Sequence, residues 1–98
     1  MSASGSAAYQ VDDERKLIIC PDGRVVRNKS PRGFELLVFL HKHPGRVFSR
    51  VELLELVWGS IRYNADNVNM QVRRLRQEVG PDVIDNLRGH GYGVGITG

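Results

Sequence analysis

The spacing of hydrophobic residues along the chain changes at Ser30. Before this residue, short apolar runs rich in branched side chains alternate with polar turns over residues 9–27. One turn, at residues 21–23, has the sequence PDG, in which proline, aspartate and glycine stand in the order that turns favour. Short branched runs separated by turns are typical of paired strands. The N-terminal part of the chain therefore predicts a small antiparallel sheet.

Beyond Ser30, apolar residues recur at the spacing of amphipathic helices. Ser30 can cap the first helix and Pro31 suits its first position, while the sequence HPG at residues 43–45 ends it. A complete capping box, SRVE at residues 49–52, begins a second helix. Gly59 ends this second helix. The chain thus continues as two short helices after the sheet.

A polar loop over residues 60–65 leads to a third helix, predicted in NVNMQVRRLRQEVG at residues 67–80, with Asn64 or Asp66 as its cap. One narrow apolar stripe of this helix consists of Val68, Val72, Leu75 and Val79. This stripe is expected to pack on the first two helices. The opposite face carries amide, thioether and guanidinium groups on Asn67, Met70, Gln71, Arg74 and Gln77. Arg73 lies on a flank, and Arg76 lies beside the stripe, from where its side chain is expected to extend outward.

The face that bears the arginines has two interpretations. It can be an ordinary solvated surface, as on most basic helices. It can also bind nucleic acid, because Asn, Gln and Arg make bidentate contacts to adenine and guanine edges, and Met70 can contact a thymine methyl group. The face lacks the glutamate-to-lysine pairs at four-residue spacing that solvated helices favour. The net charge of +3 adds a mild preference for an acidic partner.

Two strand-like runs follow, at about residues 83–87 and 92–96, on either side of the sequence RGHG. Gly89 and Gly91 permit a tight turn, which predicts a hairpin with Arg88 at its tip. We therefore expect an α+β fold, a winged helix-turn-helix with an N-terminal antiparallel sheet, three helices and a C-terminal β-hairpin wing. In such a fold the third helix enters the major groove of DNA, and the hairpin lies over the adjacent backbone or minor groove.

The remaining sequence disfavours other chemistries. The single cysteine, Cys20, permits no intrachain disulfide and favours a reducing compartment, the cytoplasm. No apolar run reaches the length of a membrane span. His41 and His43 do not face together on a helix, and nothing joins His90 to Cys20 in a ligand set. Neither a metal nor a cofactor is therefore expected.

No enzymatic activity is expected either. The glycine run GHGYGVG lacks the following helix and the acid that a dinucleotide site requires. Ser30 and Ser49 are explained as helix caps rather than nucleophiles, and no nucleophile–base pair can be assembled. Residues 1–8, which are small and carry no secretion signal, predict a flexible lead-in or linker, and residues 9–98 predict one domain.

From Ser30 onward the sequence resembles the effector domain of bacterial response regulators of the OmpR/PhoB type. The stretch SPRGFELLVFLHKHPGRVFSRVELLELVW is similar to that family's pattern T-P-x-E-F-x-L-L…H-P-G-x-V-x-S-R-x-x-L-L-x-x-V-W. VNMQVRRLRQEV resembles V-D-x-H-I-x-R-L-R-x-K-L, and LRGHGYGV resembles V-R-G-x-G-Y-R-F. Several separate motifs in the family's order make the resemblance specific, and it extends over most of the chain after residue 8.

The resemblance implies sequence-specific binding of double-stranded DNA and transcription regulation. Carried over by position, Arg74 and Met70 would read bases, with Asn67 and Gln71 close by. The residues expected to bind phosphates are Arg73, Arg76 and Trp58. Trp58 is equally well explained as a core-edge residue. On the wing, Arg88 would enter or border the minor groove, with Asn86 near it.

The resemblance also implies partners. The family's contact surface for RNA polymerase corresponds to Ser60, Ile61, Arg62, Tyr63, Asn64 and Ala65. Two copies would bind head to tail on a tandem repeat. An N-terminal regulatory domain carrying any phosphorylation switch would lie outside the chain. A winged-helix module that contacts only protein, without DNA binding, is the alternative.

Departures from the family pattern keep that alternative open and bear on the target sequence and affinity more than on the fold. Gly33 replaces the usual Glu, where glycine costs the first helix turn up to about 1 kcal/mol against alanine. Asn69 stands where Asp is usual and Gln71 where His is common. Asp66 and Gly93 replace frequent arginines, which lowers the charge available to bind phosphates.

Overall fold

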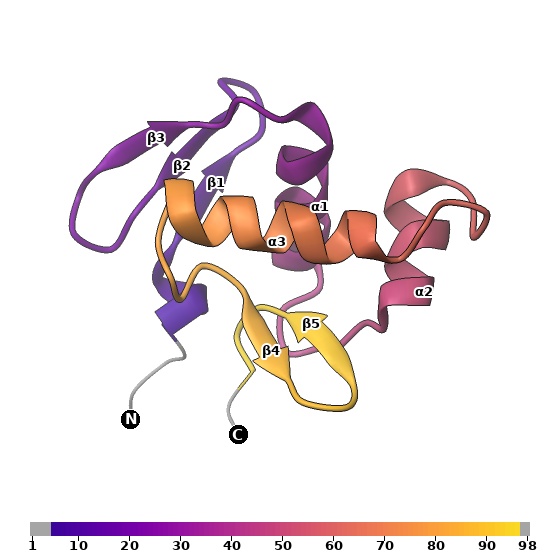
Figure 1. The fold of residues 1–98 in the computed structure, drawn as a ribbon. Coiled ribbons are helices and arrows are strands. Elements are labelled where there is room, and N and C mark those ends of the chain that lie inside the picture. The colour runs from indigo at the N-terminus through magenta and orange to yellow at the C-terminus, as the bar shows by residue number, and fades with distance from the viewer. Residues whose placement is uncertain (1–4, 97–98) are drawn as a thin grey trace.

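The computed structural model describes residues 5–96, and their fold is a winged helix-turn-helix (Figure 1). Strands β1 (Gln10–Asp12), β2 (Leu17–Ile19) and β3 (Val25–Arg27) form an antiparallel sheet in the order β1-β2-β3. Ile18, in the central strand, pairs with a valine on each side and is fully buried. The predicted N-terminal sheet is therefore confirmed.

Helix α1 (Pro31–Lys42) begins as its sequence predicts. The Ser30 side chain accepts a hydrogen bond from the Gly33 amide, and Pro31 occupies the first helical turn. The helix ends at His43, whose backbone amide donates to the Leu40 carbonyl. These contacts satisfy backbone groups that a helix end leaves without intrahelical partners.

The second helix has two parts. Helix α2 (Arg50–Leu53) begins at Ser49 with the complete capping box, since Ser49 and Glu52 each accept a hydrogen bond from the other's backbone amide. It continues as a π-helical stretch, η2 (Leu54–Trp58), which the spacing of apolar residues did not predict. Gly59 ends this stretch with a φ angle of 84°, in the left-handed region that favours glycine.

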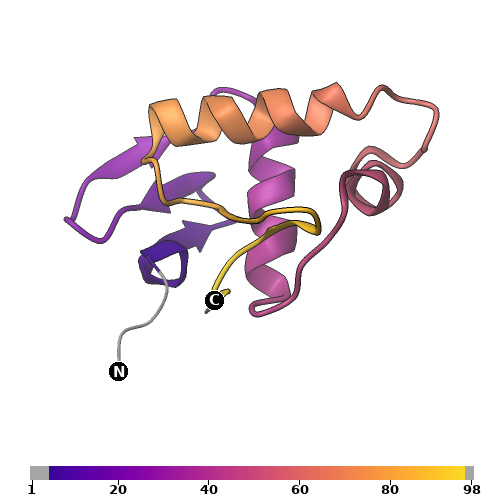
Figure 2. The same cartoon turned by 60° about the horizontal axis from the view of Figure 1, so that its bottom comes forward.

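Helix α3 (Asp66–Glu78) lies across α1 and contacts both α1 and α2 (Figure 2). The predicted stripe is confirmed, because its members Val68, Val72, Leu75 and Val79 are all buried. The predicted cap is wrong: Ala65 occupies the cap position, and its side chain makes no capping bond. The Asn64 side chain instead accepts from the Asp66 amide at 2.9 Å, which tightens the turn before the helix.

Strands β4 (Asp85–Leu87) and β5 (Gly91–Gly93) form the predicted hairpin, although each is shorter than its apolar run. Residues 83–84 and 94 point into the core instead of extending the wing. Phe48 and Tyr92 exchange two backbone hydrogen bonds, each 2.9 Å long, which pair the wing with the chain before α2. A Cβ atom at Gly91 would collide with the Phe48 carbonyl, so this pairing requires glycine.

The structure differs from the predicted flexible lead-in over residues 5–8. These residues form a 3-10 helix, η1 (Gly5–Ala8), and Ser6 is fully buried. The rest of the predicted lead-in, residues 1–4, lies outside the described residues. Within residues 5–96, no helix is both long enough and apolar enough to cross a membrane.

Candidate nucleic-acid interface

The exposed face of α3 carries side chains that are available to a ligand. Met70 is 43% exposed, and Arg73, Arg74 and Gln77 are also exposed. Within residues 5–96 neither the Arg73 nor the Arg74 side chain forms a hydrogen bond or an ion pair. Two guanidinium groups thus project from the exposed side of the helix without a compensating acid.

Two other residues predicted on this face are engaged in hydrogen bonds within the domain. Gln71 is half-buried, and its Oε1 atom accepts a hydrogen bond of 3.0 Å from the Ser30 hydroxyl. Asn67 is also half-buried, and its side-chain amide donates to the Asn64 carbonyl at 2.9 Å. The exposed face is therefore narrower than predicted. Gln71 lies three residues after Val68 and four before Leu75, beside the buried stripe, and its side chain reaches the start of α1.

Gly33 explains how Gln71 reaches this position. A Cβ atom at Gly33 would lie 2.8 Å from Gln71 Oε1, closer than real contacts allow. The unusual glycine in the first turn of α1 therefore leaves room for the Gln71 side chain. Gly33 and Gln71, two of the departures from the family pattern, therefore lie against each other in the structure.

The predicted outward path of the Arg76 side chain is wrong. Its guanidinium donates to the Ile84 carbonyl at 3.0 Å and lies 6.0 Å from the centre of the Tyr92 ring. Its Nε atom is buried and has no hydrogen-bond partner among residues 5–96. Burial beside the apolar stripe draws the side chain toward the wing, where a backbone carbonyl compensates part of the cost of desolvation.

The wing presents its tip to solvent. Asn86 and Arg88 are exposed, and Gly89 makes the turn with a φ angle of 82°. The Tyr92 hydroxyl donates to Asn69 Oδ1 on α3 at 2.8 Å, which joins the wing to the helix. The sequence did not predict this contact. The sequence does show a tyrosine in the predicted hairpin. However, no periodicity indicates which residue of the third helix its hydroxyl contacts.

A groove runs between the start of α2, the exposed side of α3 and the wing. Its polar and charged lining includes Arg50, Arg73, Arg76, Gln77, Asn86 and His90. None of the described residues that line it is acidic. Arg50, which the sequence did not single out, is exposed in the first turn of α2 and faces the same groove. Three arginines without a neighbouring acid make the groove suitable for an anionic ligand.

Trp58 and residues 60–64 of the loop before α3 lie outside this lining, whereas Ala65 is part of it. Trp58 is half-buried and packs against the core, and the Arg32 guanidinium lies 5.8 Å from the centre of its ring. The core-edge interpretation of Trp58 is therefore confirmed, and its contact with phosphate stays a prediction. In the loop, Ile61 is 63% exposed and Tyr63 is 50% exposed.

No metal site accompanies the groove in the part of the chain that the structure describes. Within residues 5–96, no three His, Cys, Asp or Glu side chains could hold an ion together. Cys20 is a free, buried thiol.

Comparison with known proteins identifies what the domain is similar to. Residues 24–94 match the family described as transcriptional regulatory protein, C terminal. The phosphate regulon transcriptional regulatory protein PhoB of Rhizobium meliloti is 48% identical over 67 residues, which cover 63% of this chain and 30% of that protein. The DNA-binding response regulator MtrA of Mycolicibacterium paratuberculosis is 42% identical over 87 residues, covering 76% of this chain and 38% of that protein.

A solved structure agrees with these relatives. The DNA-binding domain of Bacillus subtilis CssR superposes with a TM-score of 0.70 at 29% identity, covering 87% of this chain and 97% of that one. The matched regions amount to only 30% and 38% of the two curated relatives, PhoB and MtrA.

Proposed function

The chain belongs to the family of OmpR/PhoB-type effector domains, the C-terminal domains of transcriptional regulatory proteins, and on this premise we propose that it binds double-stranded DNA sequence-specifically to regulate transcription. The observation that carries the proposal is the groove between α2, α3 and the wing, with its arginines and without an acid among its described lining residues. A duplex is a polyanion, so this groove complements it.

Helix α3 enters the major groove in this proposal, and the wing lies at the adjacent minor groove. Met70 and Arg74 are exposed on the outer side of the helix and read base edges. Arg73, on the flank, binds a phosphate, and Arg50 joins it from the start of α2. These contacts fix the register of the helix on the duplex while Arg74 supplies the base preference.

On the wing, Arg88 enters or borders the minor groove with Asn86 beside it. Three further predicted DNA contacts need a rearrangement. Gln71 and Asn67 would have to leave their internal partners, and Arg76 would have to leave the Ile84 carbonyl. We therefore give Gln71 and Arg76 a positioning role in the free domain, with Asn67 and Trp58 at the margin of the interface.

The family also suggests protein partners. The exposed Ile61 and Tyr63 support a contact with RNA polymerase through the loop of residues 60–65, because large apolar side chains on a polar loop favour a protein surface. Binding as a head-to-tail pair on a tandem repeat, control by an N-terminal regulatory domain and a cytoplasmic location are part of the same proposal. Catalysis has no place in it.

Salt-dependent binding tests the proposal. Fluorescence anisotropy on a random duplex and on a selected site should show affinity falling steeply with salt, because each phosphate that an arginine neutralises releases condensed counterions. The variant Arg73→Ala should lower the slope of log affinity against log salt by about 1. A slope near zero for the wild-type domain would overturn DNA binding and leave the protein-only interaction module as the function. In that case the hydrogen bonds of Gln71 to Ser30 and of Arg76 to Ile84 would not be exchanged for contacts with DNA.

A further inference from the structure

The connecting segment, residues 79–85, runs from the end of α3 to the first residue of β4. Among the described residues, side chains from the N-terminal layer contact it at three successive positions. Arg24 binds Val79, Tyr9 binds Asp82 and Ser6 binds Asp85. The N-terminal layer lies more than fifty residues away in sequence from each of these positions. The contacts therefore join the N-terminal sheet and η1 to the link between the two elements that are proposed to touch DNA.

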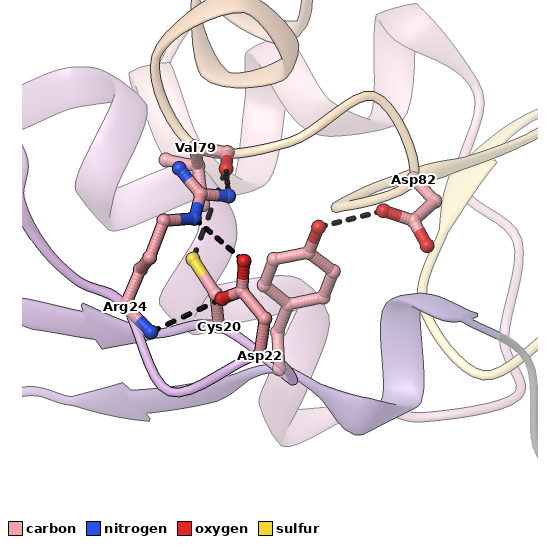
Figure 3. Close-up of polar contacts among 6 residues, drawn as sticks. Cys20, Asp22, Arg24, Val79 and Asp82 are labelled. Atoms are coloured by element: carbon pink, nitrogen blue, oxygen red, sulfur yellow. Dashed lines mark hydrogen bonds and ion pairs between the residues drawn. The ribbon is translucent and has the colours of Figure 1, made fainter.

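The first contact fixes the end of α3. Arg24 donates a hydrogen bond of 2.8 Å to the Val79 carbonyl, and the Cys20 thiol lies 3.7 Å from the same oxygen (Figure 3). Asp22 accepts from the Arg24 backbone amide and side chain, and these bonds hold the pKa of Asp22 below its usual value. A guanidinium at the C-terminal end of a helix also complements the helix dipole. Arg24 thereby sets where α3 stops and in which direction the connecting segment leaves.

The second contact holds the middle of the segment. The Tyr9 ring is buried, and its hydroxyl donates to Asp82 Oδ1 at 2.6 Å. Burial away from water, and to a smaller extent the nearby Asp82 carboxylate, raise the pKa of Tyr9 well above its ordinary value. The hydroxyl therefore stays protonated and remains a donor. A Cβ atom at Gly80 would collide with the Tyr9 hydroxyl, so the connecting segment passes against the hydroxyl end of the ring.

The third contact closes the base of the wing. The buried Ser6 hydroxyl donates to Asp85 Oδ2 at 2.6 Å and accepts from the Gly95 amide at 2.9 Å. The same Asp85 oxygen accepts from the Ile96 amide at 3.0 Å. Asp85 begins β4, and Gly95 follows β5. Ser6 therefore ties η1 to both strands of the hairpin at the end opposite Arg88.

We propose that Ser6, Tyr9 and Arg24 are positioning residues for DNA binding, which fix the wing relative to α3 before the duplex arrives. The proposal rests on the proposed function. An interface that engages two grooves at once gains affinity when its two elements already hold the bound geometry, because less freedom is lost on binding. The connecting segment is the covalent path between those elements. Loosening it should weaken the contribution of Arg88 while leaving the contacts of Arg73 and Arg74 in place.

The test uses Ser6→Ala, Tyr9→Phe and Arg24→Met, each prepared alone and combined with Arg88→Ala. Each single change should weaken binding to the selected duplex by about three- to tenfold, the range that one lost hydrogen bond covers. In the Arg88→Ala background the same changes should cost less than about twofold, because the wing contact they support is already absent. Equal losses in both backgrounds would overturn the proposal, since they would indicate general destabilisation.

The control for Arg24→Met is Arg27→Met. Arg27 ends β3 and is exposed, and its side chain forms no hydrogen bond or ion pair within residues 5–96, so this change removes the same charge from a position three residues away. Arg27→Met should leave the affinity within about twofold of wild type. If it weakens binding as much as Arg24→Met does, the effect is electrostatic and the positioning role of Arg24 fails.

Amide hydrogen exchange supplies a measurement that needs no DNA. In Ser6→Ala, the amides of Gly95 and His90 should exchange faster, while the amides of α1 keep the wild-type rates. Unchanged wing exchange in all three variants would overturn the proposal even if binding fell. If the wild-type domain binds no duplex, the proposed function fails and the DNA-positioning role fails with it. The exchange rates then report only whether these residues hold the wing.

Discussion

Replacing Gly33 with alanine should be nearly neutral in the wild-type chain and stabilising once Gln71 is removed. A glycine in the first turn of a helix costs up to about 1 kcal/mol against alanine, which is the gain available from Gly33→Ala. However, the new Cβ atom would stand 2.8 Å from Gln71 Oε1. The Gln71 side chain must then move and lose its 3.0 Å hydrogen bond from Ser30. Such a bond contributes about 0.5–1.5 kcal/mol, which offsets the gain.

A double-mutant cycle measures this coupling. Urea denaturation of the wild type, Gly33→Ala, Gln71→Ala and the double variant gives four free energies of unfolding. In the Gln71→Ala background, Gly33→Ala should stabilise the domain by up to about 1 kcal/mol, because the space is open and the bond is already absent. The coupling energy should reach about 0.5–1.5 kcal/mol. A coupling below about 0.3 kcal/mol would refute the reasoning, because the two sites would then be independent.

Two further outcomes follow from buried groups. Leu75→Ala should lower the free energy of unfolding by about 2–5 kcal/mol, because Leu75 is 2% exposed in the stripe of α3 and its truncation leaves a cavity. A loss below about 1 kcal/mol in denaturant titrations would show that the stripe does not pack against the core. The raised pKa of Tyr9 means that its contribution to stability is complete below the unfolded-state value of about 10 and is lost as pH rises from there toward the folded-state pKa. The difference in unfolding free energy between wild type and Tyr9→Phe should therefore shrink steadily in denaturation experiments above about pH 10, and a constant difference would contradict the assigned titration.

Much of the fold could be predicted because local signals agreed with the periodicity. Ser30 with Pro31, and Ser49 with Glu52, mark helix starts through contacts made within one turn. The stripe of α3 was also predictable, since a narrow apolar face on a polar helix has one way to be buried. In each case the interaction that decides the structure lies within a few residues in sequence.

The missed features depend on contacts between distant residues. The burial of Ser6 depends on Asp85, and the inward turn of Gln71 depends on the space left by Gly33. Gln71 follows Val68 by three residues and precedes Leu75 by four, so helical periodicity places it beside the buried stripe, and its placement on the outer face was wrong. The spacing alone does not show that Gly33, which lacks a Cβ atom, leaves room for the Gln71 side chain. The direction of Arg76 was likewise decided by the Ile84 carbonyl. Long side chains beside an apolar stripe choose between solvent and a buried acceptor, and only the tertiary structure supplies that acceptor.

The most direct test of the account compares base preference in Arg74→Ala and Arg73→Ala by competition binding, with a duplex library randomised at each position of the selected site. Arg74→Ala should cost about 1–3 kcal/mol on that site and relax the preference at one base pair, because its guanidinium is exposed on α3 and assigned to a base edge. Arg73→Ala should weaken binding to selected and random duplexes alike. If neither variant changes binding, the assignment of α3 as the element that reads DNA is contradicted. If Arg73→Ala alters base preference while Arg74→Ala lowers affinity uniformly, the orientation assigned to α3 in the groove is wrong by about one residue's rotation.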